Sequence, residues 1–411
     1  MRSLRVGILS MAAAVATPAG AQVGPADPAR DESPPRSILH NGAPEFDLGG
    51  GFSIKPRGRL QLDAGWVSRP PGIDDDRLGY HDEVRRVYVG VEGKIPGGIG
   101  YRAEVDRAEG RIDIIDLYLN YEPVKGLTFT VGHIKPFWGL EELSSDLFPS
   151  FMERAAFNTT FNFERRLGVA AEFANDVLLV QGGVFTDNIH ELYESEDDPR
   201  SFDARAVFMP KVSGGQLHFG GSVHVREFND SADSARYRAR PFVHTADIRF
   251  VDTGEIPATG ETGYGFETAY ISGPFHAAAE GHWKTTHRTD GPDPTFFGYA
   301  IEAGMFLTKG DTRGYRKGLF DRVKPARPVG RGGIGAIQVN ARYDYVGLND
   351  TGIVGGKQRG YEIALSWTPT AYTRVLANYG RMTYSDAAIP AAGGDRSYGV
   401  DAFGVRGQFD F

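Results

Sequence analysis

The chain is dominated by short stretches in which apolar and polar residues alternate. Every second position from 58 to 66 carries a small or apolar side chain: Gly58, Leu60, Leu62, Ala64 and Trp66. The same rhythm recurs at residues 115–121, 337–345 and 403–411. Successive side chains of a β-strand point to opposite faces, so this period predicts strands with one apolar and one polar face.

The connections between these stretches are of two kinds. Tight turns rich in Gly and Pro, such as residues 96–98 and 368–371, mostly alternate with longer polar segments, such as 68–83 and 192–202. This alternation is typical of an up-and-down membrane barrel, which has short turns at one end and long loops at the other. We count about sixteen strands between residues 52 and 411, and an even number fits a barrel of the bacterial outer membrane.

The predicted fold class is therefore all-β, a transmembrane antiparallel β-barrel of about sixteen strands. A soluble sandwich of this size would need to divide into domains, and no internal boundary is evident after residue 50. A propeller would show a repeat of about 40 residues, which is not found. After the first 21 residues no apolar run reaches the length of about 18 that a membrane-spanning helix needs.

The N-terminus carries the features of an export signal. Arg2 and Arg5 precede a mostly apolar run, and Ala19-Gly20-Ala21 forms a small-residue cleavage site. We therefore expect residues 1–21 to be a signal peptide cleaved after about Ala21. The proline-rich residues 22–50 are expected to be a flexible segment, and residues 51–411 the barrel domain.

Composition excludes several functions. The formal net charge of −8 does not favour nucleic acid as a partner, and the absence of Cys rules out thiol catalysis. The ten His residues show no metal-binding spacing, and no G-x-S-x-G motif occurs. The G-x-G-x-x-G match at residues 330–335 is followed by an alternating stretch, not a helix. We therefore expect neither an enzyme nor a cofactor.

Three connections are much longer than the others of their kind: residues 132–168, 228–262 and 309–333. Long loops in compact proteins are usually functional, and a wide barrel offers its lumen as a place for them. We expect these loops to fold into the lumen. The third loop has eight basic residues, among them Lys317 and Lys324, against two acidic ones. This charge favours a pore-facing role, with a solvated surface or a site for lipid head groups as alternatives.

The second loop contains "RYRARP", residues 236–241. In an extended chain Arg236, Arg238 and Arg240 share one face, about 7 Å apart. The polar face of the first strand carries Lys55, Arg57 and Arg59, and Arg86 belongs to the polar face of the next. These wall residues are candidates for a cationic pore lining. Pairing with nearby acids that brace the wall is an equally good interpretation.

Several blocks of sequence resemble the phosphate-selective porins O and P of bacterial outer membranes. They include "GHIKPFWGLEELSSDLFPSFMERAAFN", "AGMFLTKGDTRGY", "GLFDRVKPARPV" and "NARYDYVGLND". The resemblance runs in order from about residue 52 to residue 411, nearly the whole exported chain.

This resemblance implies a homotrimeric anion channel in the outer-membrane lipid, with phosphate as the solute. It implies that two outer loops and one periplasmic turn fold into each lumen, where arginines and lysines guide the anion. By resemblance, Arg236, Arg238 and Arg240 form the arginine-rich inner loop, and Arg154 has a counterpart beside Glu153. A general porin, or one for pyrophosphate or organic acids, is the alternative.

Overall fold

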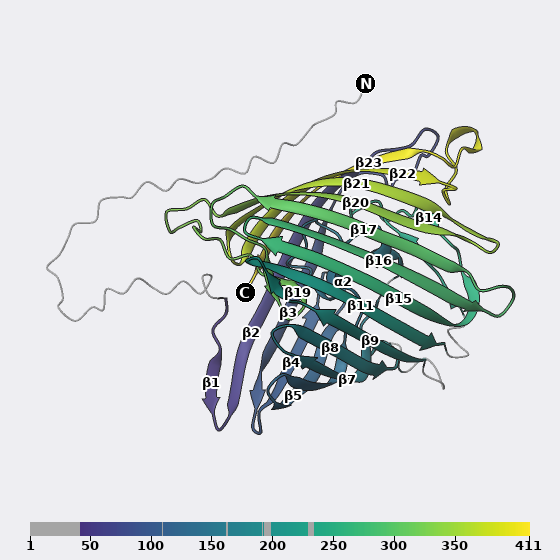
Figure 1. The fold of residues 1–411 in the computed structure, drawn as a ribbon. Coiled ribbons are helices and arrows are strands. Elements are labelled where there is room, and N and C mark those ends of the chain that lie inside the picture. The colour runs from purple at the N-terminus through teal and green to yellow at the C-terminus, as the bar shows by residue number, and fades with distance from the viewer. Residues whose placement is uncertain (1–41, 109, 162, 191, 193–198, 229–233) are drawn as a thin grey trace. The chain divides into compact units, whose positions relative to one another are not determined.

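The computed structural model describes residues 42–411 except 109, 162, 191, 193–198 and 229–233. The expected signal peptide and most of the expected flexible segment lie outside the described residues. Within them the chain forms a closed antiparallel barrel of sixteen strands, as predicted (Figure 1). In chain order the barrel strands are β2 (Phe52–Val67), β3 (Gly79–Ile95), β4 (Ile99–Asp106), β5 (Asp113–Val124), β6 (Leu127–Ile134), β7 (Arg166–Ala174), β8 (Leu178–Phe185), β9 (Arg200–Phe208), β11 (Gly215–Glu227), β15 (Ile256–Ser272), β16 (Phe275–Arg288), β17 (Thr295–Phe306), β20 (Ala336–Asp350), β21 (Ile353–Thr370), β22 (Thr373–Ser385) and β23 (Gly399–Asp410).

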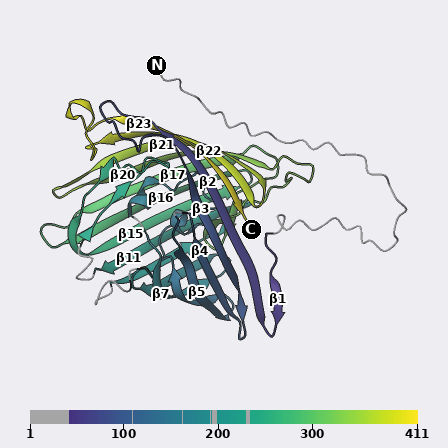
Figure 2. The same ribbon diagram turned by 180° about the vertical axis from the view of Figure 1, so that it is seen from behind.

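The barrel closes where its first strand meets its last. β2 pairs with β23 from Arg59↔Asp410 to Val67↔Ala402, and Figure 2 shows β2 crossing beside the yellow C-terminal strands. The terminal residue extends this seam, because the N–H of Phe411 donates to the carbonyl of Gly58 over 3.0 Å. Closure pairs the first barrel strand with the last, and the absence of a free edge in the membrane-spanning region is the condition for a sheet to cross a lipid bilayer.

The apolar residues of the alternating stretches face the lipid, and the residues between them face the lumen. On β21 the exposed residues Tyr361, Ile363 and Leu365 point outward, while Glu362 and Ala364 between them are buried inside. Outward aromatic rings also contact one another across strands. Ring centroids lie 4.6 Å apart for Trp283 and Phe297, and 5.0 Å apart for Tyr343 and Tyr361. Such outward aromatic groups are typical of the girdles of membrane barrels.

The connections divide between the two ends as the sequence predicts. The short turns, such as residues 96–98 and 273–274, lie at one end, together with the long connection 307–335. The other end carries the long connections 135–165 and 228–255. It also has one two-residue turn, Thr351 and Gly352, whose φ values of 42° and 86° are those of a tight hairpin.

Short strands and helices lie beside the barrel strands. They are β1 (Phe46–Gly49), β10 (Lys211–Val212), β12 (Ser234–Ala235), β13 (Arg238–Ala239), β14 (Val251–Asp252), β18 (Gly314–Arg316), β19 (Leu319–Asp321), α2 (Leu140–Leu143), α3 (Ala156–Phe161) and η1 (Ala392–Gly394). Of these, β1 lies within the segment 22–50 that was expected to be flexible, so ordered structure begins before residue 51. In the described part of the chain, no helix is long and apolar enough to cross a membrane.

The three long connections fold into the lumen, where each bonds to an inward side chain of the wall. In the first, the N–H of Ala156 donates to Asp344 over 2.9 Å. In the second, the hydroxyl of Tyr237 donates to Glu261 over 2.7 Å. In the third, the carbonyl of Gly318 accepts from buried Arg205 over 2.8 Å. Polar wall residues thus hold all three loops.

The loops also bring their own apolar core into the barrel. Buried residues from the first two loops pack together and against the inner wall, and they include Trp138, Phe157, Phe161, Tyr237 and Phe250. The ring of Trp138 stacks on Phe163 with centroids 3.9 Å apart. The lumen is therefore a packed interior on one side, which restricts any open path to the remaining space.

A buried ion pair joins the barrel seam to the first loop. Arg406 on β23 donates to both carboxylate oxygens of Asp63 on β2, over 2.7 and 2.6 Å. The same guanidinium contacts Glu153 of the 135–165 connection over 2.5 Å. All three groups are largely buried, so breaking this contact leaves charge without compensation.

We therefore expect Arg406→Ala to lower the free energy of unfolding by about 3–5 kcal/mol, because two buried carboxylates lose a partner. The double variant D63N/R406Q removes the charge from both sides of the seam and should lose less. Urea unfolding in lipid vesicles, followed by tryptophan fluorescence, measures both values. A single variant as stable as the double variant would contradict this role.

Candidate functional site

A cavity of about 500 Å³ lies between strand β3 and the connections 135–165 and 228–255. Its lining carries far more positive than negative charge. Seven arginines face three glutamates, an excess of four positive charges in a protein whose net charge is −8. The charged lining residues are Arg85, Arg86, Arg154, Arg236, Arg238, Arg240, Arg249, Glu142, Glu153 and Glu255. We call this cavity the vestibule.

The "RYRARP" segment lies along the vestibule. Its burial alternates: Arg236 and Arg238 are exposed, whereas Tyr237 and Ala239 are only 3% and 1% exposed. The alternation arises because Tyr237 and Ala239 pack into the apolar core of the loops. The arginines are thereby left on the opposite side, and all three line the vestibule, including half-buried Arg240.

The three arginines differ in how strongly they are neutralised. Arg236 donates to both oxygens of Asp252, over 2.8 and 2.6 Å, and lies 3.3 Å from Glu255. Arg240 donates to Asp247 over 2.8 Å, a carboxylate that also accepts from Arg249.

Arg238 differs from both neighbours. Its backbone pairs with that of Asp252, but within the residues that the structure describes its guanidinium makes neither a hydrogen bond nor an ion pair. Its charge therefore faces the water of the vestibule with the least compensation of the three.

The wall residues predicted from sequence all have acidic partners. Lys55 and Arg57 on β2 lie 3.6 and 2.9 Å from Glu92. Arg59 on β2 and Arg86 on β3 share Asp146 of the first loop, with 2.6 Å between Arg86 and the carboxylate. The bracing interpretation therefore describes their contacts. Of this group, the structure places Arg86 in the vestibule lining.

Arg154 and its neighbour Glu153 have different partners. The carboxylate of Glu153 binds Arg85 over 3.1 Å, and Arg406. Arg154 donates to the carbonyls of Glu141, Glu142 and Ser144 over 3.0 to 3.2 Å, and its guanidinium lies 3.6 Å from the Glu142 carboxylate. It therefore clamps the turn of its own loop while lining the vestibule.

Lys317 and Lys324 lie in the third loop and do not line the vestibule. Lys317 is at the tip of the β18–β19 hairpin, 3.6 Å from Glu172 on the wall. Lys324 is exposed, and among the described residues it has no polar partner. The ten predicted cations are thus divided between the vestibule, the wall near β2, and the opposite end of the lumen.

Sequence reasoning missed Arg85, which lines the vestibule beside Arg86. Strict alternation would place neighbouring residues on opposite faces. A β-bulge in β3 shifts the register between Gln61↔Arg86 and Leu62↔Val84, so that Arg85 is an extra residue. Such bulges re-aim side chains at functional sites. Pattern alone does not reveal them.

A titratable amine lies behind the vestibule. Lys135, just after β6, donates to the carboxylate of Glu142 over 2.6 Å. Burial lowers the pKa of the Lys135 ammonium to about 8, and the nearby Arg154 acts in the same direction. Glu142 lines the vestibule and also lies 3.6 Å from Arg154, so the charge on Lys135 compensates part of this negative charge.

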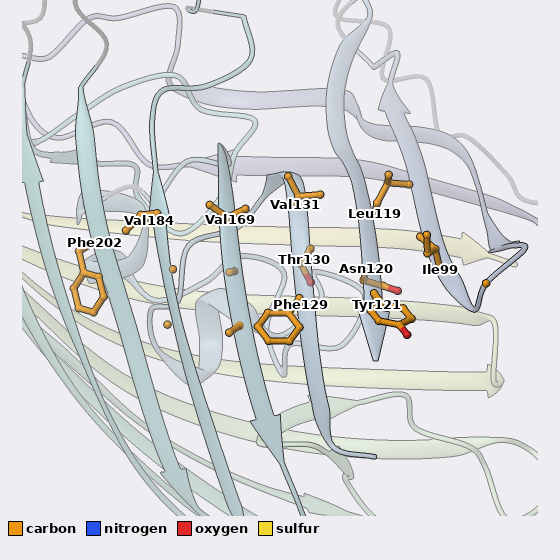
Figure 3. Close-up of a pocket in the computed structure, with 15 residues that line it drawn as sticks. Ile99, Leu119, Asn120, Tyr121, Phe129, Thr130, Val131, Val169, Val184 and Phe202 are labelled. Carbon is orange, nitrogen blue, oxygen red and sulfur yellow. The ribbon is translucent and has the colours of Figure 1, made fainter. Parts of the chain in front are cut away.

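A second, larger hollow lies on the outward face and is apolar. It has a volume of about 740 Å³ and is lined by side chains of neighbouring strands from β4 to β9, among them Phe129, Val169 and Phe202 (Figure 3). Exposed Val131 and Val184 border it, on the side of the sheet that faces lipid. Its lining has no charged group, so it is not a site for ions.

The sequence model of one protein family, described as phosphate-selective porin O and P, matches residues 54–411. The chain belongs to this family. An uncharacterised protein of Caulobacter vibrioides is 44% identical over 393 residues, which cover 93% of this chain and 79% of that protein. The porin barrel therefore accounts for nearly all of the described residues, and it places the protein in the bacterial outer membrane.

Solved structures share the fold at low sequence identity. OmpT, an outer-membrane protein of Vibrio cholerae, has a TM-score of 0.56 at 12% identity and covers 90% of this chain and 100% of its own. An anion-selective porin from Comamonas acidovorans has a TM-score of 0.53 at 11% identity, covering 88% and 100%. At this identity the comparison supports the barrel architecture alone.

The charge of Lys135 leads to a pH prediction for this porin. The ammonium is present below a pKa of about 8 and is lost as the pH rises through it. The vestibule then becomes less positive, because Glu142 loses one of its two cationic partners and keeps only Arg154, 3.6 Å away. We expect the ratio of anion to cation permeability to fall between pH 7 and pH 9 in planar bilayers. Lys135→Arg, which keeps its charge, should abolish the fall. A wild-type ratio that is constant over this range would contradict the role of Lys135.

Proposed function

We propose that this porin forms a passive, anion-selective diffusion channel, with phosphate as its preferred solute. The observation that carries the proposal is the excess of four positive charges lining the vestibule of an acidic protein. A cavity with like-charged, low-dielectric walls concentrates counter-ions, so anions accumulate there and cations are repelled. The family described as phosphate-selective supports the choice of solute.

Arginine suits this task by its geometry. Its planar guanidinium offers five donors that match phosphate oxygens, and it stays charged at any physiological pH. Conduction also requires that no single site hold the ion too tightly. In the vestibule most arginines already contact a carboxylate or backbone carbonyls. These contacts weaken the affinity of each arginine for an anion and leave a series of binding sites of moderate affinity.

The path we propose leads from the "RYRARP" segment to the wall near β2. Arg236, Arg238 and Arg240 receive the anion, and Arg85, Arg86 and Arg154 follow in the same cavity. Arg59, Arg57 and Lys55 continue along β2 towards the short-turn end, because alternate residues of one strand share its inner face. Lys317 and Lys324, at the third loop, are proposed to act near the exit.

The proposed channel assembles as a homotrimer in the outer-membrane lipid. One of the solved relatives, the in-vitro folded OmpT of Vibrio cholerae, is described in its trimer form. The apolar hollow between β4 and β9 and the rest of the outward face are available for lipid or for neighbouring protomers. No contact between protomers enters the mechanism of the vestibule.

A broader selectivity is the second candidate. The vestibule, at about 500 Å³, is larger than a single phosphate needs, so pyrophosphate or organic acids could also pass. The anion-selective porin of Comamonas acidovorans shares this barrel fold without being described as specific for phosphate. Both candidate functions are those of a passive channel, and neither requires an enzymatic activity.

The triple variant R236A/R238A/R240A tests the proposal. It removes three of the seven vestibule arginines, so the anion preference in KCl gradients should weaken and the block of chloride current by phosphate should be lost. Planar-bilayer reversal potentials and conductance measure both effects. The outward-facing Arg381→Ala, paired with Asp401 across the outer surface, serves as the matched control. Unchanged selectivity in the triple variant would exclude these residues from the pore lining.

The three arginines should not contribute equally. Arg238 lacks a carboxylate partner among the described residues, so Arg238→Ala should weaken phosphate block more than Arg236→Ala or Arg240→Ala. Conversely, Asp252→Asn removes one of the two carboxylates that Arg236 contacts and should strengthen phosphate block, because more of its guanidinium becomes available to the anion. Single-channel block at graded phosphate concentration ranks the four variants. Equal effects of the three alanine variants would show that pairing with a carboxylate does not determine how strongly each arginine binds phosphate.

A further inference from the structure

Two cations lie on the outer face of the barrel, remote from the vestibule. Arg359 on β21 is exposed and Lys357 is half-buried, and both alternate with the fully buried, inward-facing Gln358. Within the described residues neither makes an ion pair or a hydrogen bond. The guanidinium of Arg359 contacts the ring of Tyr345, 5.8 Å from its centroid.

Their height on the barrel can be estimated from Trp367 on the same strand. Trp367 faces outward near the short-turn end, where its indole N–H donates to the carbonyl of Ile334 over 2.7 Å. At about 3.3 Å per residue and a strand tilt of about 40°, Lys357 lies about 25 Å above it. That is about the height of the apolar band of an outer-membrane barrel. Lys357 therefore reaches the head-group layer at the long-loop end, and Arg359 lies just beneath.

Polar and aromatic groups surround the two cations. Strand pairing puts Tyr345 beside Arg359 and Gly347 beside Lys357 on one side, with Thr383 and Ser385 on the other. Tyr361 and Tyr343 contact each other below the cations, at the level where aromatic residues anchor barrels at the membrane interface. The nearby Arg381 is neutralised by Asp401. Two positive charges thus remain uncompensated at the lipid boundary.

We propose that Lys357 and Arg359 bind a phosphate group on the head group of an outer-leaflet lipid. The two side chains are about 7 Å apart along one face of the strand, so both can reach a single phosphate between them. The guanidinium pairs with two phosphate oxygens, and the ammonium adds a point charge. Basic clusters at a membrane boundary are known to recognise phosphorylated lipid head groups in this way.

The face on which they lie decides between a lipid and a free solute. Both cations are separated from the lumen by the sheet itself, whose inward residues here are Gln358 and Glu362. A solute in the channel does not reach them, whereas lipid head groups cover this surface. The inference is independent of the anion selectivity proposed above.

Native mass spectrometry of the detergent-solubilised porin tests it, with diphosphorylated lipid A and dephosphorylated lipid A as probes. We expect wild type to retain the phosphorylated lipid at least tenfold more strongly. The double variant K357A/R359A should lose this preference. Lys125→Ala, an exposed cation in a turn at the short-turn end, should keep it. Equal retention of the two lipids by wild type, or an unchanged preference in the double variant, would overturn the proposal.

Two further experiments test whether binding is electrostatic and whether the bound phosphate belongs to a lipid or to a free solute. K357R/R359K keeps both charges and should retain the phosphorylated lipid, and loss of binding there would refute an electrostatic site. An excess of inorganic phosphate should leave the lipid bound, and displacement by free phosphate would overturn the assignment to a lipid. Reversal potentials of K357A/R359A should equal those of wild type, since the pair faces away from the pore.

Discussion

The hydrogen bonds between β2 and β23 are the constraint on which the rest of the structure depends. A backbone N–H or carbonyl without a partner costs several kcal/mol in lipid, so a sheet can cross a membrane only if it has no free edge. Pairing from Arg59↔Asp410 to Val67↔Ala402 removes that edge. Once the sheet is closed, each strand has one face in lipid and one face inside. Most polar side chains in the middle of the spanning strands must then be accommodated in the lumen.

That requirement explains why the lumen is crowded with ion pairs. Inward arginines such as Arg205, Arg342 and Arg406 are almost fully buried, and each contacts a glutamate or aspartate. A buried charge without a partner is unstable, whereas a paired one can brace the wall. The three inward loops exploit the same groups, since they attach to the wall through them. Arginines that could guide an anion are therefore also structural, and the least paired ones stand out. In the vestibule, that is Arg238. On the lipid face, it is Lys357 and Arg359.

The fold followed from the sequence to a large extent. Alternation of period two in Phe403–Phe411 and similar stretches predicted the strands, and the spacing of turns predicted their number. The three long connections were identified by length alone, and all three fold inward. Within the segment 22–50 that was expected to be flexible, Phe46–Gly49 forms a hairpin with the start of β2. This pairing is local, because a two-residue turn joins the two strands, and it does not depend on closure of the barrel.

The contacts of individual side chains could be predicted from the sequence to a smaller extent. The sequence by itself determined that Arg236, Arg238 and Arg240 share a face, because an extended chain has no other way to arrange alternate residues. Only the tertiary structure decided that Asp252 and Asp247 neutralise two of them, and that Glu153 binds Arg85 and Arg406 instead of Arg154. It also decided that a bulge turns Arg85 towards the vestibule. The physical reason is the distance along the chain over which each property is determined. Side-chain direction in a strand is set by the local backbone. Charge compensation depends on groups far apart in the sequence, which meet only when the barrel closes and its loops fold in.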